Sequence, residues 1–200
     1  MALSVKDCGA VILAGGQSRR MGQSKALLLW EGETLLSRLS RRLSLFDEVL
    51  LSANDPELGT GLPLRTVADR YPGAGPLAGL HSALSATDKQ ALFCVPCDQP
   101  YFSPALAEML MEEFPAGAEA FVCRDSSQHV HPLCGIYTKA ALPHITEQIE
   151  KMGNFRMMDL LPRLKCVYFD TAQYFPDQIF FNMNTPPDYQ ILTDGGPGQS

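Results

Sequence analysis

The sequence predicts an α/β fold in which one domain is built around a mainly parallel sheet. Short apolar runs alternate along the chain with segments whose apolar residues recur at helical spacing, which is the pattern of repeated strand–helix units. The run ALFCVP at 91–96 is apolar at nearly every position, as expected for a strand covered by helices on both faces. A chain of 200 residues with 46% hydrophobic content suits one domain with a sizeable core.

Four strands and two helices are predicted in the first half of the chain. The strands are at 10–13, 48–53, 64–69 and 91–96. The helices are at 34–44 and 76–86, the second after a loop rich in glycine and proline. The first helix is indicated by leucines at helical spacing with arginines between them: Leu35, Leu36, Leu39 and Leu43.

Three strands and three helices are predicted in the second half. The strands are at 118–123, 131–137 and 166–170, and the helices are at 104–114, 139–151 and 155–161. Ser103 with Pro104, and later Thr185 with Pro186, have the pattern of a cap followed by a first-turn proline. The segment TDGGPGQS has no apolar content to bury, so we predict a domain over 1–192 and a disordered tail over 193–200.

Charge and hydropathy exclude several classes of function. The net charge is −6 and the pI is about 5.2, so the surface repels polyanions and a general nucleic-acid binder is not expected. No run approaches the ~18 consecutive apolar residues of a membrane span. The beginning of the sequence lacks the features of a secretory signal. We therefore predict a cytoplasmic protein without a membrane partner.

The cysteines and histidines do not complete a metal site in the sequence. Six cysteines are spread through the predicted strands and are interpreted as buried free thiols. Cys94 and Cys97 have CxxC spacing, but no second pair at matching spacing accompanies them, so a redox or metal role is the less favoured alternative. His129 and His131 share the alternation of a strand but lack a third ligand, so His131 with Pro132 is interpreted as loop chemistry and a metal pair is the less favoured alternative.

The stretch GAVILAGGQSRRMGQSKALLLWEG at 9–32 places an anion site after the first strand. Gly15 and Gly16 let the backbone approach a ligand closely, and Arg19, Arg20 and Lys25 supply positive charge. The spacing is neither that of a P-loop nor that of the dinucleotide fingerprint. The alternative is an ordinary turn at the exit of a strand, with solvated arginines.

Asp98, in CVPCDQPY at 94–101, follows an apolar strand and so lies at the sheet edge where α/β proteins bind ligands. A carboxylate there suits Mg²⁺, which takes carboxylate and phosphate oxygens together. The alternative is an aspartate that begins a turn before Pro100.

Two further loops are predicted at the same edge. In DRYPGAGPLAGLHSAL at 69–84, Asp69 ends a strand and is placed to accept hydrogen bonds from a purine or a ribose, with a simple helix-entry loop as the alternative. In FNMNTPPDY at 181–189, Asn182 and Asn184 lie on the same side of an extended segment. Their amides suit a polar second substrate, with capping and turn chemistry as the alternative.

The four motifs together resemble a known family. LAGGQSRRMGQSK resembles the signature LAGGxSxRMGxxK of the sugar-nucleotide-transferase-like nucleotidyltransferases. With YPGAGPLAG, PCDQPY and FNMNTP in this order, the chain from about residue 9 to 190 is similar to the molybdenum cofactor guanylyltransferase branch (MobA-like). The resemblance implies a Rossmann-like three-layer αβα sandwich. It also implies transfer of GMP from GTP to the phosphate of molybdopterin carrying molybdenum, with Mg²⁺ as cofactor and pyrophosphate as leaving group.

The resemblance implies roles for individual residues. The positions implied to bind the nucleotide are Leu13, Ala14, Gly15, Gly16, Lys25, Ser52, Asn54, Asp69 and Asp98. Lys25 contacts the phosphates in this assignment, and Asp98 holds the Mg²⁺. The positions implied for the pterin side are Asn182, Asn184 and Arg156. Two positions depart from the pattern: Ser24 replaces an acidic residue before the lysine, and Ser52 replaces an asparagine, with Asn54 two residues on.

The hypothesis for catalysis is in-line attack by a phosphate oxygen of the acceptor on the α-phosphorus. Lys25, Arg20 and Asp98 are the candidate catalytic residues, with Lys25 and Arg20 offsetting charge on the departing pyrophosphate. The alternatives are a cytidylyltransferase acting on the same pterin or on another small phosphorylated acceptor, and a non-catalytic nucleotide-binding regulator. A handover of the product to molybdoenzymes or to other cofactor-synthesis proteins is left open.

Overall fold

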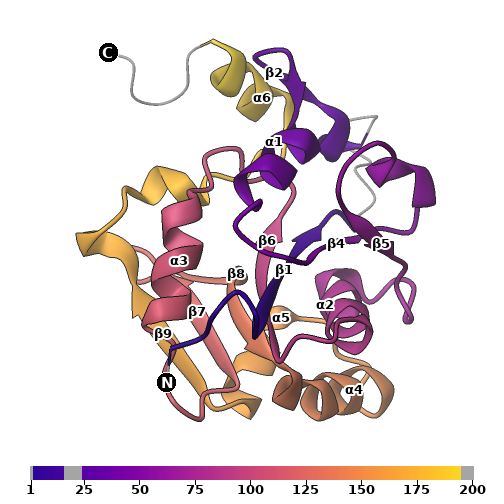
Figure 1. Ribbon diagram of the computed structural model, residues 1–200, viewed down its shortest axis with the longest axis vertical. Helices are drawn as coiled ribbons and strands as arrows, with labels where there is room; N and C mark the ends of the chain where they lie inside the picture. The colour runs from indigo at the N-terminus through magenta and orange to yellow at the C-terminus, as the bar shows by residue number, and fades with distance from the viewer. Residues whose placement is uncertain (1, 16–23, 195–200) are drawn as a thin grey trace.

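A computed structural model describes residues 2–15 and 24–194, and its centre is a seven-stranded sheet (Figure 1). The strand order is β5-β4-β1-β6-β8-β7-β9. The strands are β1 (Cys8–Leu13), β4 (Val49–Ser52), β5 (Arg65–Val67), β6 (Ala91–Pro96), β7 (Ala120–Arg124), β8 (Val130–Thr138) and β9 (Cys166–Asp170). All seven strands predicted from the sequence are present, and β6 has the predicted bounds.

The sheet is mainly parallel, as predicted. β5, β4, β1 and β6 pair in parallel, and β7 pairs in parallel with β9. β8 runs antiparallel to both of its neighbours, β6 and β7. Strand β8 therefore begins at the edge of the sheet where β1, β4, β6 and β7 end. Its first residues lie at the edge that was predicted to bind the ligand.

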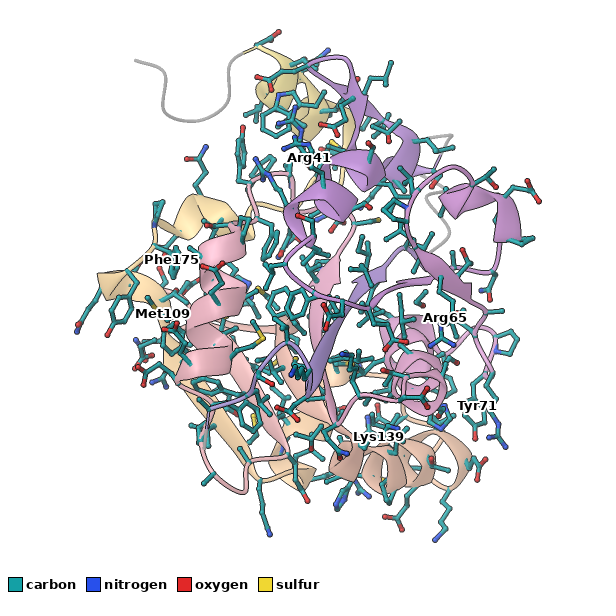
Figure 2. The ribbon with its side chains drawn as sticks, in the orientation of Figure 1. Arg41, Arg65, Tyr71, Met109, Lys139 and Phe175 are labelled. Carbon is teal, nitrogen blue, oxygen red and sulfur yellow. The ribbon has the colours of Figure 1, made fainter. Side chains whose placement is uncertain are left out.

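Two layers of helices cover the two faces of the sheet, which confirms the three-layer αβα sandwich. On one face lie α1 (Leu35–Arg42) and α3 (Pro104–Glu112), and on the other lie α2 (Gly75–Ala86), α4 (Leu142–Glu150) and α5 (Met157–Leu160). Alternate residues of β1 divide between the layers: Ile12 packs with α1 and α3, and Val11 packs with α2. Side chains fill the space on both sides of the sheet (Figure 2).

A third, smaller apolar cluster lies beside the sandwich. Its buried members are Leu28, Leu35, Met183 and Leu192. Leu28 immediately precedes the hairpin of β2 (Leu29–Trp30) and β3 (Glu33–Thr34), and Leu35 begins α1. Met183 lies in the segment before α6 (Pro186–Thr193), and Leu192 lies in that helix. Figure 1 shows α6 and β2 together at one end of the molecule, and the hydroxyl of Tyr189 joins them by donating to the carbonyl of Leu29 over 2.7 Å.

Several elements differ in detail from their predictions. The predicted helix at 139–151 begins with a 3₁₀ turn at Lys139–Ala141, and the one at 155–161 continues into a 3₁₀ turn at Leu161–Arg163. Ser103 stands at the N-cap of α3, but its side chain accepts no capping hydrogen bond, whereas Thr185 and Asp188 form a full capping box on α6. Helix α6 extends to Thr193, one residue into the predicted tail, and residues 195–200 lie outside the described part of the chain.

Within the described residues, no helix combines the length and the apolar character needed to cross a membrane.

Candidate functional site

The side chain of Lys25 joins two distant parts of the chain at the carboxyl edge of the sheet. Its Nζ donates a hydrogen bond to Asp98 Oδ2 over 2.8 Å and another to Asn184 Oδ1 over 2.7 Å. The Lys25 and Asp98 side chains are 17% and 16% exposed, so this ion pair is largely shielded from water. The structure thus brings together three predicted site residues: Lys25, predicted to contact the nucleotide, Asp98, predicted to hold the metal, and Asn184, predicted to contact the acceptor.

Backbone hydrogen bonds hold the three segments of this cluster in place. Asp98 lies two residues after β6, and the amide of Cys97 donates to the carbonyl of Leu13 over 3.0 Å, which keeps β6 beside β1 beyond the end of the ladder. The amide of Met183 donates to the carbonyl of Asp98 over 2.9 Å. This bond fixes the segment that carries Asn182 and Asn184 against the loop that carries Asp98.

A cavity of about 360 Å³ opens at this cluster. Its lining residues come from the ends of β1 and β6, the start of α2, strand β8 and the segment before α6: Leu13, Ala14, Gly15, Lys25, Pro76, Pro96, Cys97, Asp98, Leu133, Asn182 and Asn184. The volume falls within the range of small-molecule sites. Four of these lining residues were not among the predicted site residues: Pro76, Pro96, Cys97 and Leu133. Leu133 is reached only because β8 starts at this edge.

A second cavity of about 380 Å³ shares Ala14 and Gly15 with the first and extends toward Asn54. Three of the predicted nucleotide residues form a hydrogen-bonded group beside it. Ser52 Oγ donates to Asp69 Oδ1 over 3.3 Å, and Asn54 Nδ2 donates to Asp69 Oδ2 over 3.1 Å. The Asp69 amide donates back to Asn54 Oδ1 over 3.0 Å. The Asp69 carboxylate also lies beside Gly15, because a Cβ added there would be 3.7 Å from Asp69 Oδ2.

Two predicted site residues are not described by the structure, and a third lies away from the cluster. Gly16 and Arg20 lie outside the described residues. Arg156 is exposed at the N-cap of α5, where its carbonyl accepts a hydrogen bond from Gln148, and it is absent from the described linings of both cavities. The structure therefore does not bring Arg156 to the cluster of Lys25, Asp98 and Asn184.

The donor set at Asp98 fits a magnesium ion that binds together with a nucleotide. In the described residues, no group of three or more His, Cys, Asp or Glu side chains forms a self-contained metal site. Magnesium in nucleotide enzymes takes one or two carboxylates and completes its shell with phosphate oxygens and water. The Asp98 carboxylate, at the wall of the first cavity, is suited to that role.

The two cysteines of the CxxC pair are buried, and His131 contacts two neighbouring side chains. All six cysteines are free thiols, and burial raises the pKa of Cys97 to about 12, with the charge of Asp98 adding to the shift. Burial also raises the pKa of Cys94, so the CxxC pair remains protonated and is poorly suited to thiolate chemistry. His131 stacks on Phe180 with centroids 3.9 Å apart, and its Nε2 lies 2.9 Å from Asp125 Oδ2.

Comparison with known proteins gives a consistent family. The family model of the MobA-like NTP transferase domain matches residues 10–166. A probable molybdenum cofactor guanylyltransferase of Pelotomaculum thermopropionicum is 37% identical over 89% of this chain and 88% of its own. One from Carboxydothermus hydrogenoformans is 33% identical over 94% and 96%.

The solved structures agree with the sequence relatives. The crystal structure of molybdopterin-guanine dinucleotide biosynthesis protein A from Archaeoglobus fulgidus has a TM-score of 0.81 and 25% identity, covering 93% of this chain and 97% of that one. A nucleotidyl transferase from Methanothermobacter thermautotroptrophicus, with 19% identity and a TM-score of 0.71 over 94% and 96%, shares the fold. On the family match and the identities with these relatives, the chain belongs to the MobA-like NTP transferase family.

Proposed function

We propose that the protein transfers GMP from GTP to the phosphate of molybdopterin carrying molybdenum and releases pyrophosphate. The observation that carries the proposal is the contact of Lys25 with both Asp98 and Asn184, since it joins a nucleotide side and an acceptor side in one cavity. Relatives at 37% and 33% identity that are named probable molybdenum cofactor guanylyltransferases support the choice of substrates.

In this proposal the guanosine lies along the end of β1 and in the second cavity. The backbone of 13–15 approaches the nucleotide, and Asp69 accepts hydrogen bonds from the base or the ribose. Ser52 and Asn54 already donate to the Asp69 carboxylate, so its orientation is set before the nucleotide binds. This preorganisation lowers the entropic cost of binding.

The triphosphate lies in the first cavity, with Lys25 and Asp98 on its wall. The Lys25 ammonium exchanges its contact with Asp98 for phosphate oxygens and offsets the charge of the departing pyrophosphate. A magnesium ion bound at Asp98 supplies further neutralisation of the phosphate oxygens. Asn182 and Asn184 orient the acceptor, whose phosphate is already ionised and therefore needs no strong general base.

The test is pyrophosphate release that depends on both GTP and the molybdenum-loaded pterin. Lys25→Ala and Asp98→Ala are expected to lower turnover by about 10²–10³-fold with the fold intact by circular dichroism, because each removes charge stabilisation from the transition state. Lys151→Ala is the control, since this lysine is 75% exposed at the C-cap of α4. Near-full activity of either site variant at saturating Mg²⁺ contradicts the assignment, and tight GTP binding without release favours a regulator.

Base selectivity is tested separately by thermal shift with GTP, CTP and ATP in the presence of Mg²⁺. GTP is expected to stabilise the protein most, because at equal concentration the ligand with the higher affinity for the folded state stabilises it more, by RT ln(1 + L/Kd), where L is the free ligand concentration. Ser52 stands where the family pattern has an asparagine, which makes this measurement necessary. A larger shift with CTP identifies a cytidylyltransferase and leaves nucleotidyl transfer itself in place.

A further inference from the structure

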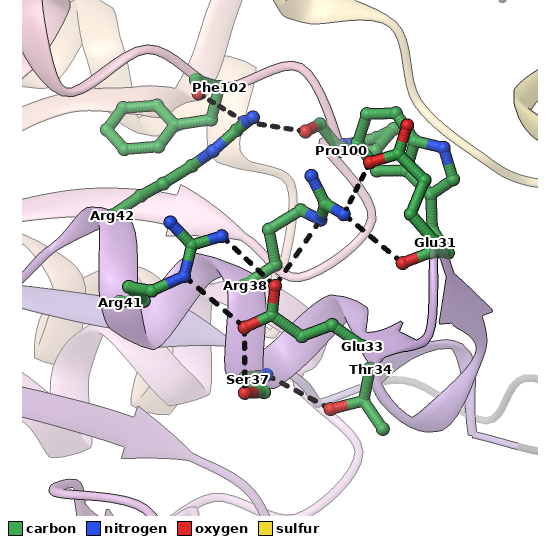
Figure 3. A network of polar contacts seen from close by, with 10 residues as sticks. Glu31, Glu33, Thr34, Ser37, Arg38, Arg41, Arg42, Pro100 and Phe102 are labelled. Carbon is green, nitrogen blue, oxygen red and sulfur yellow. Dashed lines mark hydrogen bonds and ion pairs between the residues drawn. The ribbon is translucent and has the colours of Figure 1, made fainter. Parts of the chain in front are cut away.

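Helix α1 carries three arginines, and two of them, Arg38 and Arg42, bond to the segments that follow the candidate catalytic residues Lys25 and Asp98 (Figure 3). Arg38, Arg41 and Arg42 lie on its last turns. Arg38 and Arg42 are largely or half buried, whereas the Arg41 side chain is 64% exposed. Desolvation of a guanidinium is costly unless its donors have partners. A buried arginine is therefore expected to make specific contacts.

Arg42 is bonded to the loop that carries Asp98. Its Nη1 donates to the carbonyl of Pro100 and to the carbonyl of Phe102, each over 2.7 Å. These acceptors lie two and four residues after Asp98, in the connection between β6 and α3. Removal of the donor leaves two carbonyls without this partner in a partly buried loop, so the loop must rearrange to hydrate them.

Arg38 is bonded to the hairpin that follows Lys25. Its Cζ lies 4.0 Å from the centroid of the Trp30 ring, and its Nη2 donates to the Trp30 carbonyl over 3.2 Å and to Glu31 Oε2 over 2.8 Å. The Trp30 ring in turn packs edge-on against Tyr101 at a centroid distance of 5.3 Å. The Lys25 segment and the Asp98 loop are therefore fastened to the same helix and to each other.

We propose that Arg42 is a positioning residue for nucleotidyl transfer, which holds the loop of residues 97–103 so that the Asp98 carboxylate faces Lys25 and the bound nucleotide. Arg38 does the same for the segment that follows Lys25. Neither arginine is among the lining residues of the first cavity, so both act through the residues to which they are hydrogen-bonded. The inference rests on the proposed function, because it assigns Asp98 to the metal–nucleotide complex.

The contrast between Arg42 and Arg41 gives a matched test on adjacent residues. Arg41 has the same charge and the same helix, but its guanidinium meets only the carboxylate of Glu33 among the described residues. Both bonds of Arg42 come from one nitrogen, so a lysine ammonium is able to replace them. Arg42→Met keeps the apolar stem without the donor, Arg42→Gln is the second such variant, and Arg42→Lys is the conservative rescue.

The primary measurement is Mn²⁺ binding in the presence of GTP, followed by electron paramagnetic resonance. Arg42→Met is expected to weaken Mn²⁺ binding and to lower kcat by roughly 10–100-fold, since small displacements of a reacting group have effects of this size. Arg42→Lys is expected to recover most of both quantities, and Arg41→Gln to match the wild type. Thermal unfolding of each variant shows whether the comparison is made on folded protein, and Arg42→Gln replaces Arg42→Met if the latter does not fold.

Unchanged Mn²⁺ affinity in both Arg42→Met and Arg42→Gln overturns the inference, as does an equal loss in Arg41→Gln. Failure of Arg42→Lys to restore the metal affinity also overturns it, because hydrogen bonding to the two carbonyls is then not the cause. These outcomes can be distinguished from a failure of the proposed function. If the wild type releases no pyrophosphate with the loaded pterin, the function fails, while Mn²⁺ and GTP binding still reports on Arg42.

Discussion

The Lys25 ammonium lies between a charged oxygen of Asp98 and a neutral oxygen of Asn184. Both charged side chains are mostly shielded, so their attraction is weakened less by water than that of a surface pair. The arrangement also gives Asp98 a temporary counter-charge before any nucleotide is bound. In the proposed reaction, a phosphate that draws Lys25 away would leave the carboxylate free for a metal ion.

A double-mutant cycle measures this attraction. Lys25→Met and Asp98→Asn are each expected to lower the free energy of unfolding, and the double variant less than their sum, with a coupling of about 1–3 kcal/mol from urea denaturation. The control pair is Glu147 on α4 and Lys151 at its C-cap, whose side chains are 45% and 75% exposed and lie 3.4 Å apart. Its coupling is expected at ~0.3–0.5 kcal/mol. Equal coupling in the two pairs would falsify the view that shielding strengthens the first.

At the scale of elements, site residues that directly follow a strand could be predicted from the sequence. Contacts between segments far apart in the chain could not. Asp98 was predictable because it follows an unambiguous apolar strand. The hairpin of β2 and β3 was missed because each strand has only two residues, although Glu31 and Gly32 carry its signal. Both adopt positive φ, 52° and 80°, as a two-residue hairpin turn requires. The contact of Asn184 with Lys25 could not be predicted from the sequence, because it depends on the hydrogen bond from Met183 to Asp98, which joins two distant segments.

The packing of α2 against β4 depends on a glycine. A Cβ added at Gly79 overlaps Ser52 Oγ and lies 3.3 Å from Ser52 Cβ. Gly79→Ala is therefore expected to turn the Ser52 hydroxyl away from Asp69 and to weaken GTP binding. The net loss of stability is expected to be about 1 kcal/mol, since crowding is partly offset by the helix propensity of alanine.

The double variant Gly79→Ala with Ser52→Ala separates these two effects. Removal of the hydroxyl relieves the overlap, so thermal stability is expected to recover, while GTP affinity stays low because Asp69 has lost one donor. Isothermal titration with GTP provides the affinity. Unaltered affinity in Gly79→Ala would show that the Ser52–Asp69 bond has no part in nucleotide binding.

At the scale of the whole molecule, two histidines, the buried His81 and the half-buried His131, make the fold sensitive to mild acid. Burial lowers the pKa of His81 below 6.5, and the charge of Arg70 adds to the shift. Burial also lowers the pKa of His131, an effect that outweighs the opposite influence of Asp125. In the unfolded chain both titrate near 6.5, so below that pH the unfolded state binds more protons than the folded state. Stability is complete above about pH 6.5 and falls as the pH drops through the lowered values.

Urea denaturation at pH 7 and pH 5 is expected to give a smaller free energy of unfolding at the lower pH. His81→Gln and His131→Gln are each expected to reduce this difference, because each removes a group that gains a proton on unfolding. His144→Gln, which removes a partly exposed histidine on α4, serves as the control. A pH dependence that both buried-site variants leave unchanged assigns the acid sensitivity to other groups.

The hydrogen bond from Met183 to Asp98 has a consequence for the synthesis of the protein. The sheet strands have all been translated once residue 170 is added, and domains begin to fold as they emerge from the ribosome, at roughly 5–20 residues per second. The loop of Asp98 nevertheless lacks one of its hydrogen-bond partners until Met183, which follows the last strand of the sheet, has been translated. A chain that already contains all seven strands therefore still lacks the residues that complete the cluster around Lys25, namely Met183 and Asn184.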